Sequence, residues 1–345
     1  MANPAGRFER LSVEYDAEAS VDEEGEVIQP RTQFLRDDSQ SVLSFNDSKD
    51  VPFRIGLNPY RGCEHGCAYC YARPTHEYLG LSAGLDFETR IFVKERAPEL
   101  LAAELSKKSW HPEIIGMSGV TDCYQPVERR LGLTRRCLAV LADFRNPVGI
   151  LTKNHLVTRD IDLLQELARH DAVSVSISIT TLDGELAKIM EPRASSPTRR
   201  LAAIKELSDA GIYVRVTMAP VIPGLTDHEI PAIFAAAAEA GAKYGSLLLL
   251  RLPGAVAPLF EQWLEERLPG SKDKVLGRIR DMRGGKLNDP RPHVRMRGEG
   301  IFADQIQTLG AIAKRKAGFK ESNRKRLSAA AFRVPGTISQ LDLFN

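Results

Sequence analysis

A membrane-spanning helix is missing from the sequence, because the chain of 345 residues has no run of about 18 or more apolar residues. The segment Met1 to Arg7 lacks an apolar core, so we expect no secretory signal. Cysteine is scarce as well. Only five are present, and three lie within one stretch of eight residues, which excludes a framework of disulfides. Free thiols persist in a reducing compartment, and we therefore expect a cytoplasmic protein.

A strong overall charge is also missing, since 47 basic residues nearly balance 45 acidic ones. The distribution is nevertheless uneven. Residues 311–326 hold seven basic residues and one acid, and residues 267–297 hold ten basic residues and three acids. This basic C-terminal third predicts a polyanionic partner such as DNA or another nucleic acid. The alternative is a solvated helical face with no partner.

The region from residue 51 to 255 alternates short apolar runs with amphipathic helical patterns. The expected strands cover 53–57, 114–121, 148–152, 173–180, 214–219 and 246–251, with a further short strand over 87–94. The expected helices cover 97–108, 132–144, 159–169, 198–210 and 227–241. This alternation predicts an α/β fold with a parallel sheet. About six units, fewer than the eight of a closed barrel, indicate a partial (βα)6 TIM-like barrel.

The two ends of the chain differ from this middle region. Residues 1–50 are polar with few apolar clusters and predict a flexible N-terminal extension, with a loop over 37–50. Residues 256–325 predict a helical basic C-terminal region, with helices over 256–282 and 301–316 and a loop over 283–300. Residues 326–345 form a tail that we expect to be extended or disordered.

Cys63, Cys67 and Cys70 have the spacing C-x3-C-x2-C, with no fourth cysteine nearby. Thiolates are the ligands of iron–sulfur clusters, and a four-iron cluster normally takes four, so three leave one iron open. Gly62 and Gly66 let the backbone wrap closely round a metal centre. The alternative is a structural zinc site, for which His65 or His76 would supply the fourth ligand.

With Tyr69 directly before the third cysteine, this motif resembles the signature of the radical S-adenosylmethionine (SAM) superfamily. The resemblance covers residues 50–255. It implies a [4Fe-4S] cluster on the three cysteines, SAM on the open iron, and reductive cleavage of SAM to a 5′-deoxyadenosyl radical that takes hydrogen from a substrate. It also implies an electron donor such as flavodoxin or ferredoxin.

Other motifs are similar to the subgroup typified by spore photoproduct lyase. They follow the first, second, fourth and fifth strands of the expected barrel. The segments are Cys70-Tyr71-Ala72-Arg73, Thr121-Asp122 with Tyr124-Gln125-Pro126, Glu191-Pro192-Arg193, and Ala219-Pro220 through Asp227.

Several residues are candidates for holding SAM. The resemblance places the backbone at Tyr69 beside the adenine. Lys153 ends the third strand and is a candidate for the SAM carboxylate. Ser176 and Ser178 share one face of the fourth strand, where either would reach the amino-acid portion or the ribose. Asp122 is a further polar candidate, and for each of these the alternative is local hydrogen bonding. The Gly-Gly-Glu that the family often carries after the second strand is absent, which leaves the SAM amine without an assigned contact.

Cys123 is a separate candidate, because the lyase subgroup uses a cysteine as hydrogen-atom donor. The alternative is a small buried thiol in the core. We expect Arg193 either to bind an anion or to form a structural ion pair.

The tail ends in Gln340-Leu341-Asp342-Leu343-Phe344, which resembles the pentapeptide that binds the bacterial sliding clamp. Leu343 and Phe344 would fill an apolar pocket while Gln340 makes a polar contact. The alternative is a tail that packs these side chains on its own barrel.

Three functions remain open from the sequence. The first is a radical SAM enzyme in DNA repair or nucleic-acid modification, lyase-like or with other radical chemistry. The second is a radical SAM enzyme that modifies a peptide or small molecule, although a second cysteine cluster is missing. The third is a metal-stabilised binding protein without catalytic activity.

Overall fold

The strands carry two kinds of side chain at alternate positions, and this alternation shapes the barrel. In β8 (Val173–Ser178) the three aliphatic residues are completely buried and the three serines lie on the other face. The aliphatic residues join the main hydrophobic core, where β8 packs against α5 (Ile161–Ala168) and α7 (Pro197–Asp209). Burial of each such side chain stabilises the fold by about 1.5–3 kcal/mol. The serines are left to line the interior of the barrel.

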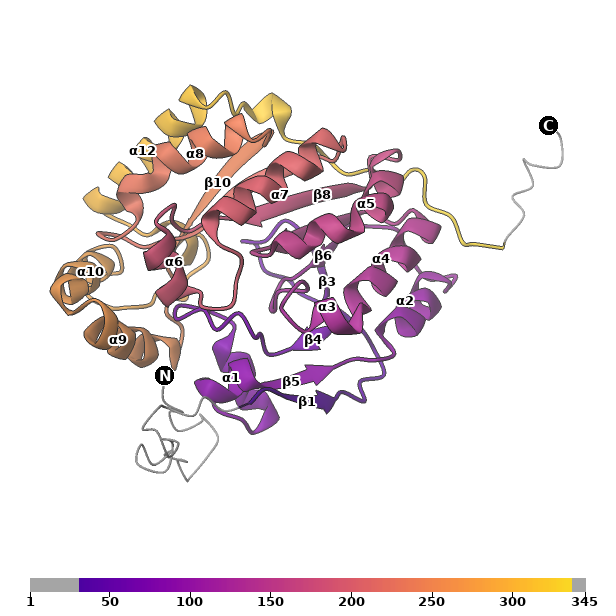
Figure 1. Ribbon diagram of the computed structural model, residues 1–345, viewed down its shortest axis with the longest axis horizontal. Helices are drawn as coiled ribbons and strands as arrows, with labels where there is room; N and C mark the ends of the chain where they lie inside the picture. Colours follow the sequence, from indigo (N-terminus) through magenta and orange to yellow (C-terminus); the bar gives the residue numbers. More distant parts are fainter. Residues whose placement is uncertain (1–30, 337–345) are drawn as a thin grey trace.

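Six parallel strands form this barrel in the computed structural model, which describes residues 31–336 (Figure 1). Their order in the sheet follows their order in the chain. They are β3 (Ile55–Leu57), β6 (Ile115–Met117), β7 (Val148–Thr152), β8, β9 (Val214–Val221) and β10 (Tyr244–Leu249). Within the described residues β10 stands at one end of the sheet and does not pair with β3, so the barrel is open. The predicted partial (βα)6 barrel is confirmed.

Helices cover the outside of the sheet (Figure 1). The long ones are α2 (Ala97–Leu105), α4 (Leu133–Phe144), α5, α7, α8 (Ile230–Glu239) and α12 (Ile301–Lys316). The shorter elements are α3 (Glu128–Leu131), α6 (Gly184–Met190), η2 (Arg73–Thr75), η3 (Glu77–Leu79), η4 (His155–Asp160) and η5 (Asp227–Glu229). The five barrel helices predicted from the sequence agree with the observed bounds to within three residues at each end. None of the helices described is long and apolar enough to span a lipid bilayer.

The loop predicted over residues 37–50 is wrong in part, because this segment contains a strand. β2 (Leu43–Phe45) pairs antiparallel with β3 and extends the sheet past its first parallel strand. Val42 and Leu43 are buried in the main core, which supplies the stability that so short a strand lacks by itself. The N-terminal segment therefore covers an edge of the barrel from residue 42 onward.

A second, smaller sheet lies beside the barrel and takes the strand predicted over residues 87–94. Its strands are β1 (Gln33–Arg36), β5 (Arg90–Val93) and β4 (Tyr60–Arg61), in the order β1-β5-β4. The first part of the predicted strand is instead helix α1 (Leu85–Thr89). Phe87 explains the difference, because its buried ring packs edge-on against His76, with 5.3 Å between ring centroids. This contact ties α1 to the segment that carries the cysteines.

The C-terminal region is helical, as predicted, and it packs onto the cysteine segment. Its helices are α9 (Val256–Arg267), α10 (Pro269–Asp281), α11 (Val294–Arg297) and α12, and α11 occupies part of the loop predicted over 283–300. Phe260 and Trp263 of α9 stack, with ring centroids 5.5 Å apart. They share a second hydrophobic cluster with Cys67 and Tyr69. Residues 256–281 thus form one wall of the cysteine site.

Many basic residues of this region are hydrogen-bonded or ion-paired to other residues of the chain. Arg283 is buried and donates to the backbone carbonyls of Leu250 (2.8 Å) and Val294 (2.7 Å). Ion pairs join Arg291 to Asp289, Arg295 to Asp50, Arg278 to Asp227 and Lys272 to Glu265. The basic count of residues 267–297 therefore overstates the charge available to a partner.

Residues beyond α12 cross the end of the barrel where the strands begin. Tyr213, just before β9, donates through its hydroxyl to the carbonyl of Asn323 (2.5 Å). Ser328 N–H donates to the carbonyl of Asp171, before β8, and Arg333 N–H to that of Phe144, before β7 (3.0 Å each). This segment closes the barrel end opposite the cysteines. The Gln340–Phe344 pentapeptide lies outside the described residues.

Candidate active site

The three motif cysteines lie in one loop that follows β3 and β4, at the end of the barrel where parallel strands finish. Cys63 and Cys67 are buried and Cys70 is half-buried. None of the three takes part in a disulfide. The loop is held by backbone hydrogen bonds, in which Cys63 N–H donates to the carbonyl of Phe87 (2.9 Å) and Cys70 N–H to that of Cys67 (3.2 Å).

Two glycines give the loop its close turns, as the sequence indicated. Gly62 has φ +81° and Gly66 has φ +66°, the left-handed region that other residues rarely adopt. Space is as restrictive as the backbone angle. A Cβ at Gly66 would overlap the Glu88 carboxylate and lie 2.6 Å from Nη2 of Arg193, and a Cβ at Gly62 would lie 2.8 Å from the Phe87 carbonyl oxygen.

Arg73 organises the loop from inside, a role that the sequence did not reveal. Its side chain is completely buried and donates to the carbonyls of Cys67 (3.1 Å), Ala83 (3.2 Å) and Gly84 (2.7 Å). It also forms an ion pair with Glu88 (3.3 Å). Arg193 pairs with the other oxygen of Glu88, so the structural ion pair predicted for Arg193 is present.

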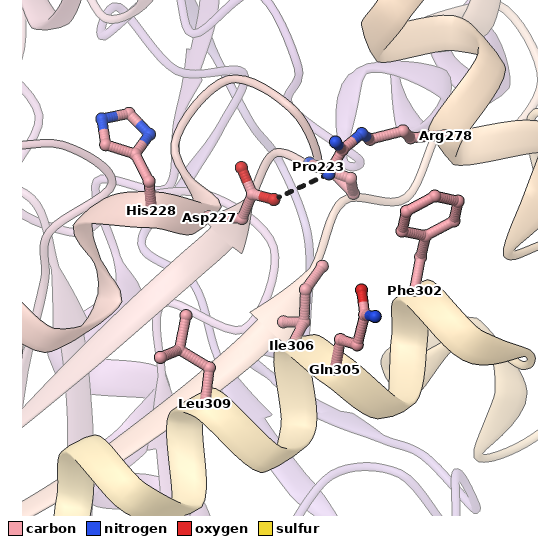
Figure 2. Close-up of a pocket in the computed structure, with 8 residues that line it drawn as sticks. All are labelled: Pro223, Asp227, His228, Arg278, Phe302, Gln305, Ile306 and Leu309. Atoms are coloured by element: carbon pink, nitrogen blue, oxygen red, sulfur yellow. Dashed lines mark hydrogen bonds and ion pairs between the residues drawn. The ribbon is translucent and has the colours of Figure 1, made fainter.

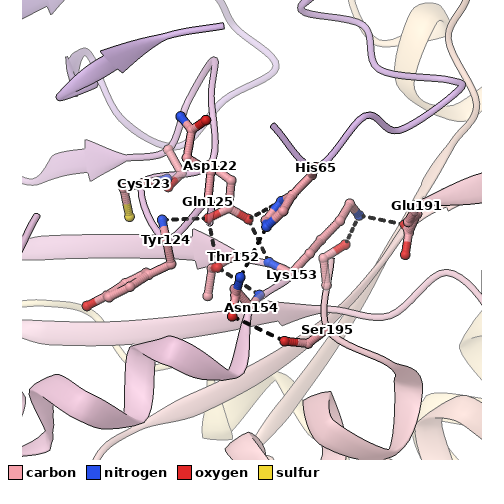
Figure 3. Close-up of polar contacts among 12 residues, drawn as sticks. His65, Asp122, Cys123, Tyr124, Gln125, Thr152, Lys153, Asn154, Glu191 and Ser195 are labelled. Carbon is pink, nitrogen blue, oxygen red and sulfur yellow. Dashed lines mark hydrogen bonds and ion pairs between the residues drawn. The ribbon is translucent and has the colours of Figure 1, made fainter. Parts of the chain in front are cut away.

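The loop after β6 holds the cysteine loop from the other side. Gln125 is fully buried, accepts a hydrogen bond from Glu64 N–H (2.9 Å) and donates to the Gly62 carbonyl (3.1 Å). Asp122 accepts from the Thr152 hydroxyl and from Lys153 N–H, both at 2.8 Å. Both oxygens of Asp122 are thus engaged by protein groups (Figure 3). Asp122 thus positions the end of β7, and its contact with SAM stays a prediction.

Lys153, Ser178 and Tyr69, three of the predicted SAM residues, come together at the mouth of the barrel. The Lys153 ammonium donates to the Ser178 hydroxyl (2.7 Å) and to the Ala219 carbonyl (2.9 Å). It also lies 5.6 Å from the centre of the Tyr69 ring. Burial lowers the pKa of Lys153 to about 8. The cation is therefore desolvated, and its electrostatic interactions are stronger than those of a surface lysine.

Glu191 completes this cluster and was not recognised as a site residue, although the Glu191-Pro192-Arg193 motif marks its position. Its carboxylate is buried and accepts hydrogen bonds from the hydroxyls of Tyr69 and Thr180 and from Arg200. Lys153 Nζ lies 3.4 Å from Glu191 Oε1 (Figure 3). Burial raises the pKa of Glu191, while the Arg200 guanidinium acts in the opposite direction.

Two predicted residues do not join the Lys153 cluster. Ser176 lies deeper in the barrel and accepts a hydrogen bond from Arg215 Nε (2.9 Å). Cys123 is completely buried in the main hydrophobic core. A hydrogen-atom donor must reach the substrate, so the burial of Cys123 argues against that role, and burial also raises the pKa of its thiol. The structure agrees with the alternative, in which Cys123 is a small buried thiol of the core.

Both histidines considered as zinc ligands are bound to other protein groups. His65 Nδ1 lies 3.4 Å from the Asp122 carboxylate and its Nε2 lies 3.2 Å from Asn154 Nδ2, and burial lowers its pKa to about 4. His76 Nε2 lies 2.9 Å from the Arg90 carbonyl, while its buried Nδ1 has no hydrogen-bond partner within the described residues. Within residues 31–336, no three His, Cys, Asp or Glu side chains converge on the position of a single metal ion. A four-iron cluster does not require the ligands to converge on one point, because each thiolate binds its own iron.

The thiol set fits such a cluster chemically. All three sulfurs are free, and burial raises the pKa of the Cys67 and Cys70 thiols. Lys153 acts against this increase at both thiols, and Arg73 does so at Cys70, because positive charge stabilises a thiolate.

The loop after β9, the last of the quoted motifs, has a structural role. Asp227 accepts from Gly224 N–H (2.9 Å) and pairs with Arg278 of α10 (3.4 Å). Figure 2 shows this pair at a pocket between the loop and α12, lined mainly by apolar groups such as Pro223 and Phe302. The motif therefore joins the barrel to the C-terminal helices.

Comparisons with known proteins agree with this geometry. Residues 57–237 match the family model described as the radical SAM superfamily. An uncharacterized protein of Mycobacterium tuberculosis is 38% identical over 234 residues, 67% of this chain and 68% of that protein. The radical SAM Nalpha-GlyT isomerase of Pseudomonas phage M6 is 24% identical over 64% of this chain and 44% of its own. A spore photoproduct lyase solved with AdoMet and dinucleoside spore photoproduct has a similar fold, with TM-score 0.51, 17% identity, and 68% of this chain and 67% of that one covered.

Proposed function

Because the chain belongs to the radical SAM superfamily, we propose that it repairs or modifies a base in nucleic acid, with DNA as the substrate. The protein is an enzyme of radical chemistry that uses a [4Fe-4S] cluster and SAM. Membership of this family excludes the third possibility, a binding protein without catalytic activity. When bound, the cluster and SAM supply a 5′-deoxyadenosyl radical that removes a hydrogen atom from the substrate.

The residues of the chain have distinct tasks in this proposal. Cys63, Cys67 and Cys70 hold the cluster, and Arg73 keeps their loop in place. Lys153 and Ser178 hold the amino-acid end of SAM at the mouth of the barrel, where Lys153 is already desolvated. Positioning by these groups, with water excluded, is the contribution of the protein to the rate.

One observation favours a nucleic-acid base as the substrate. Tyr71, next to Cys70, is 45% exposed. Its hydroxyl is fixed on the Gly119 carbonyl (2.7 Å) and the Arg251 guanidinium lies 5.3 Å from the centre of its ring. A rigid exposed aromatic ring beside a cation is the usual platform on which unpaired bases stack. The fold of a lyase that was solved with a dinucleoside adds support to this proposal.

The interior of the barrel is suited to a polar planar group. Ser176, Arg215, Thr217 and Ser246 line it, with Thr217 and Ser246 hydroxyls 3.0 Å apart. Ser176 already bonds to Arg215 and Thr217 to Ser246, so a base that enters the barrel would exchange these contacts for its own.

The test is an anaerobic assay of 5′-deoxyadenosine formation, with SAM, reductant and either no DNA, intact duplex or ultraviolet-damaged single strands. We expect DNA to change the turnover of SAM, and we expect Tyr71→Ala to remove this response while leaving the DNA-free turnover in place. The matched control is Tyr78→Ala, because Tyr78 is also exposed (70%). If the protein binds no DNA at low salt and DNA leaves turnover unchanged, a peptide or small-molecule substrate replaces this proposal.

A further inference from the structure

A basic pocket lies on the rim of the barrel, directly beside the SAM residues. Its volume is about 370 Å³, and it opens between α3, the first residues of η4 and the beginning of α7. We call it the rim pocket. Its lining residues are Arg129, Asn154, His155, Leu156, Thr158, Arg159, Ser195 and Arg199.

The rim pocket carries three guanidinium groups and no acidic lining residue. Arg159 is fixed by ion pairs with Glu128 and Asp160, both at 2.7 Å. Arg129 is exposed, and its side chain has no hydrogen bond or ion pair within residues 31–336. One arginine is thus held in place while another remains available, which favours an anion with several oxygen acceptors.

Arg199 extends the cationic face, and His155 orients its guanidinium. Arg199 is exposed and donates to His155 Nδ1 (3.1 Å), which therefore acts as an acceptor. His155 Nε2 lies 2.8 Å from Glu206, so the ring is oriented on both sides. Arg199 also lies in the first turn of α7, whose N-terminal end adds partial positive charge to the pocket.

The rim pocket is connected to the active site through two short contacts. Ser195 N–H donates to the Lys153 carbonyl (3.2 Å), and Asn154 Nδ2 lies 3.2 Å from Nε2 of His65, which stands between two of the motif cysteines. A group bound in the pocket would therefore lie beside the mouth of the barrel. Figure 3 shows Asn154 and Ser195 next to Lys153.

We propose that the rim pocket binds a backbone phosphate of the nucleic acid whose base enters the barrel. This inference rests on the proposed function and adds to it a fixed point that sets the register of the strand. Phosphate contacts position a nucleic acid without reading its sequence, which suits an enzyme that must find one altered base in any context.

The experiment compares two double variants in the reconstituted full-length protein. Arg129→Ala with Arg199→Ala empties the pocket of its two exposed cations. The control is Lys107→Ala with Arg169→Ala, which removes the same charge from exposed residues at the C-terminal ends of α2 and α5, away from the cysteines. Affinity for duplex and single-stranded DNA is measured over a range of salt concentrations, together with DNA-free turnover of SAM.

We expect the pocket variant to lower the slope of log affinity against log salt by about 0.9 on duplex or about 0.7 on single strands, the effect of one lost phosphate contact. The control should keep the wild-type slope, and both variants should keep the DNA-free turnover. Arg129→Lys with Arg199→Lys retains the charge and should restore most of the slope. Circular dichroism and thermal unfolding confirm that each variant is folded.

The outcomes separate this inference from the proposed function. If the wild type binds DNA but the pocket variant behaves like the control, the rim pocket does not bind a backbone phosphate. The proposed function then still stands. If the wild type binds no DNA, both fall together. A final measurement uses inorganic phosphate in place of DNA. If phosphate protects the wild type but not the pocket variant against thermal unfolding, while DNA affinity is equal in the two, the pocket takes a free phosphate compound and the inference is wrong.

Discussion

Buried charges at single positions hold the active site together. Arg73 and Glu191 are both almost inaccessible to solvent, and each is surrounded by polar partners. A buried charge without its partner costs several kcal/mol. Substitutions at these positions should therefore disturb the site more than substitutions of exposed charged residues.

Arg73→Met should lower the free energy of unfolding by about 3–5 kcal/mol, because three backbone carbonyls and Glu88 lose their donor. Arg73→Lys should lower the free energy of unfolding less, since the lysine ammonium can replace some of the hydrogen bonds that the guanidinium donates. Urea unfolding and the iron content after anaerobic reconstitution measure the two effects. Arg169→Met, at an exposed position, is the control. Wild-type iron content in Arg73→Met would show that this residue does not organise the loop.

Ser178→Ala should weaken SAM binding about 10-fold, equivalent to ~1.4 kcal/mol, because Lys153 loses a hydrogen-bond partner at the mouth of the barrel. Ser176→Ala is the matched comparison on the same face of β8, and its hydroxyl bonds to Arg215 instead. We expect its SAM affinity to stay within about twofold of wild type, well under the cost of one hydrogen bond. Equilibrium dialysis of the reconstituted proteins under anaerobic conditions decides between them, and equal losses would contradict the assignment.

At the scale of elements, the cysteine loop is held in place by contacts with three other segments. The β6 loop holds it through Gln125, α1 through Glu88, and the segment after α6 through Arg193. The loop has no regular secondary structure over most of its length, so its shape depends on these contacts and on its two left-handed glycines.

Gly66→Ala should abolish most cluster assembly, whereas Gly80→Ala should not. Both glycines have positive φ (+66° and +71°), so each alanine costs about 1–2 kcal/mol of backbone strain. Only Gly66 is also crowded, because its Cβ would overlap the Glu88 carboxylate, while nothing lies within 4 Å at Gly80. Iron and sulfide content, with absorbance of the reconstituted protein, measures the difference. Equal iron content in the two variants would mean that the loop tolerates a wider turn.

For the whole molecule, the hydrophobic interior is divided between the barrel and the active site. The main core fills the space between the sheet and its helices and contains none of the three motif cysteines. Cys67 belongs to the cluster formed with α9 and α10, and Cys63 to a small cluster with Phe87. The barrel is therefore stabilised independently of the metal centre.

Removal of iron by a chelator should loosen the cysteine loop and the α9–α10 wall while the barrel stays folded. A bound cofactor stabilises the regions that contact it, by mass action, and leaves the separate core unchanged. Hydrogen exchange of the apo and reconstituted proteins should show faster exchange over residues 62–73 and 256–281 and equal exchange in β7, β8 and β9. Faster exchange throughout the barrel would contradict this division of the core.

The repeated strand and helix pattern was predictable because it is local. Each strand has alternating apolar residues and each helix has an apolar stripe, so β7 was predicted with its observed bounds. β1, β2 and β4 were missed because they are short and lie outside the repeat of strand and helix, whereas β5 falls within the strand predicted over 87–94. Their pairing partners lie elsewhere in the chain, and burial of neighbouring residues supplies their stability.

The sequence by itself determined the cysteine spacing, the need for glycine at positions 62 and 66, and the order of the barrel strands. The tertiary structure alone decided which polar candidates meet. It joined Lys153 to Ser178 and Glu191, buried Cys123, paired much of the C-terminal basic charge internally, and gathered arginines from α3, η4 and α7 into the rim pocket. The physical reason is that these contacts link residues tens of positions apart, so they leave no periodic pattern in the chain and appear only when the strands are side by side.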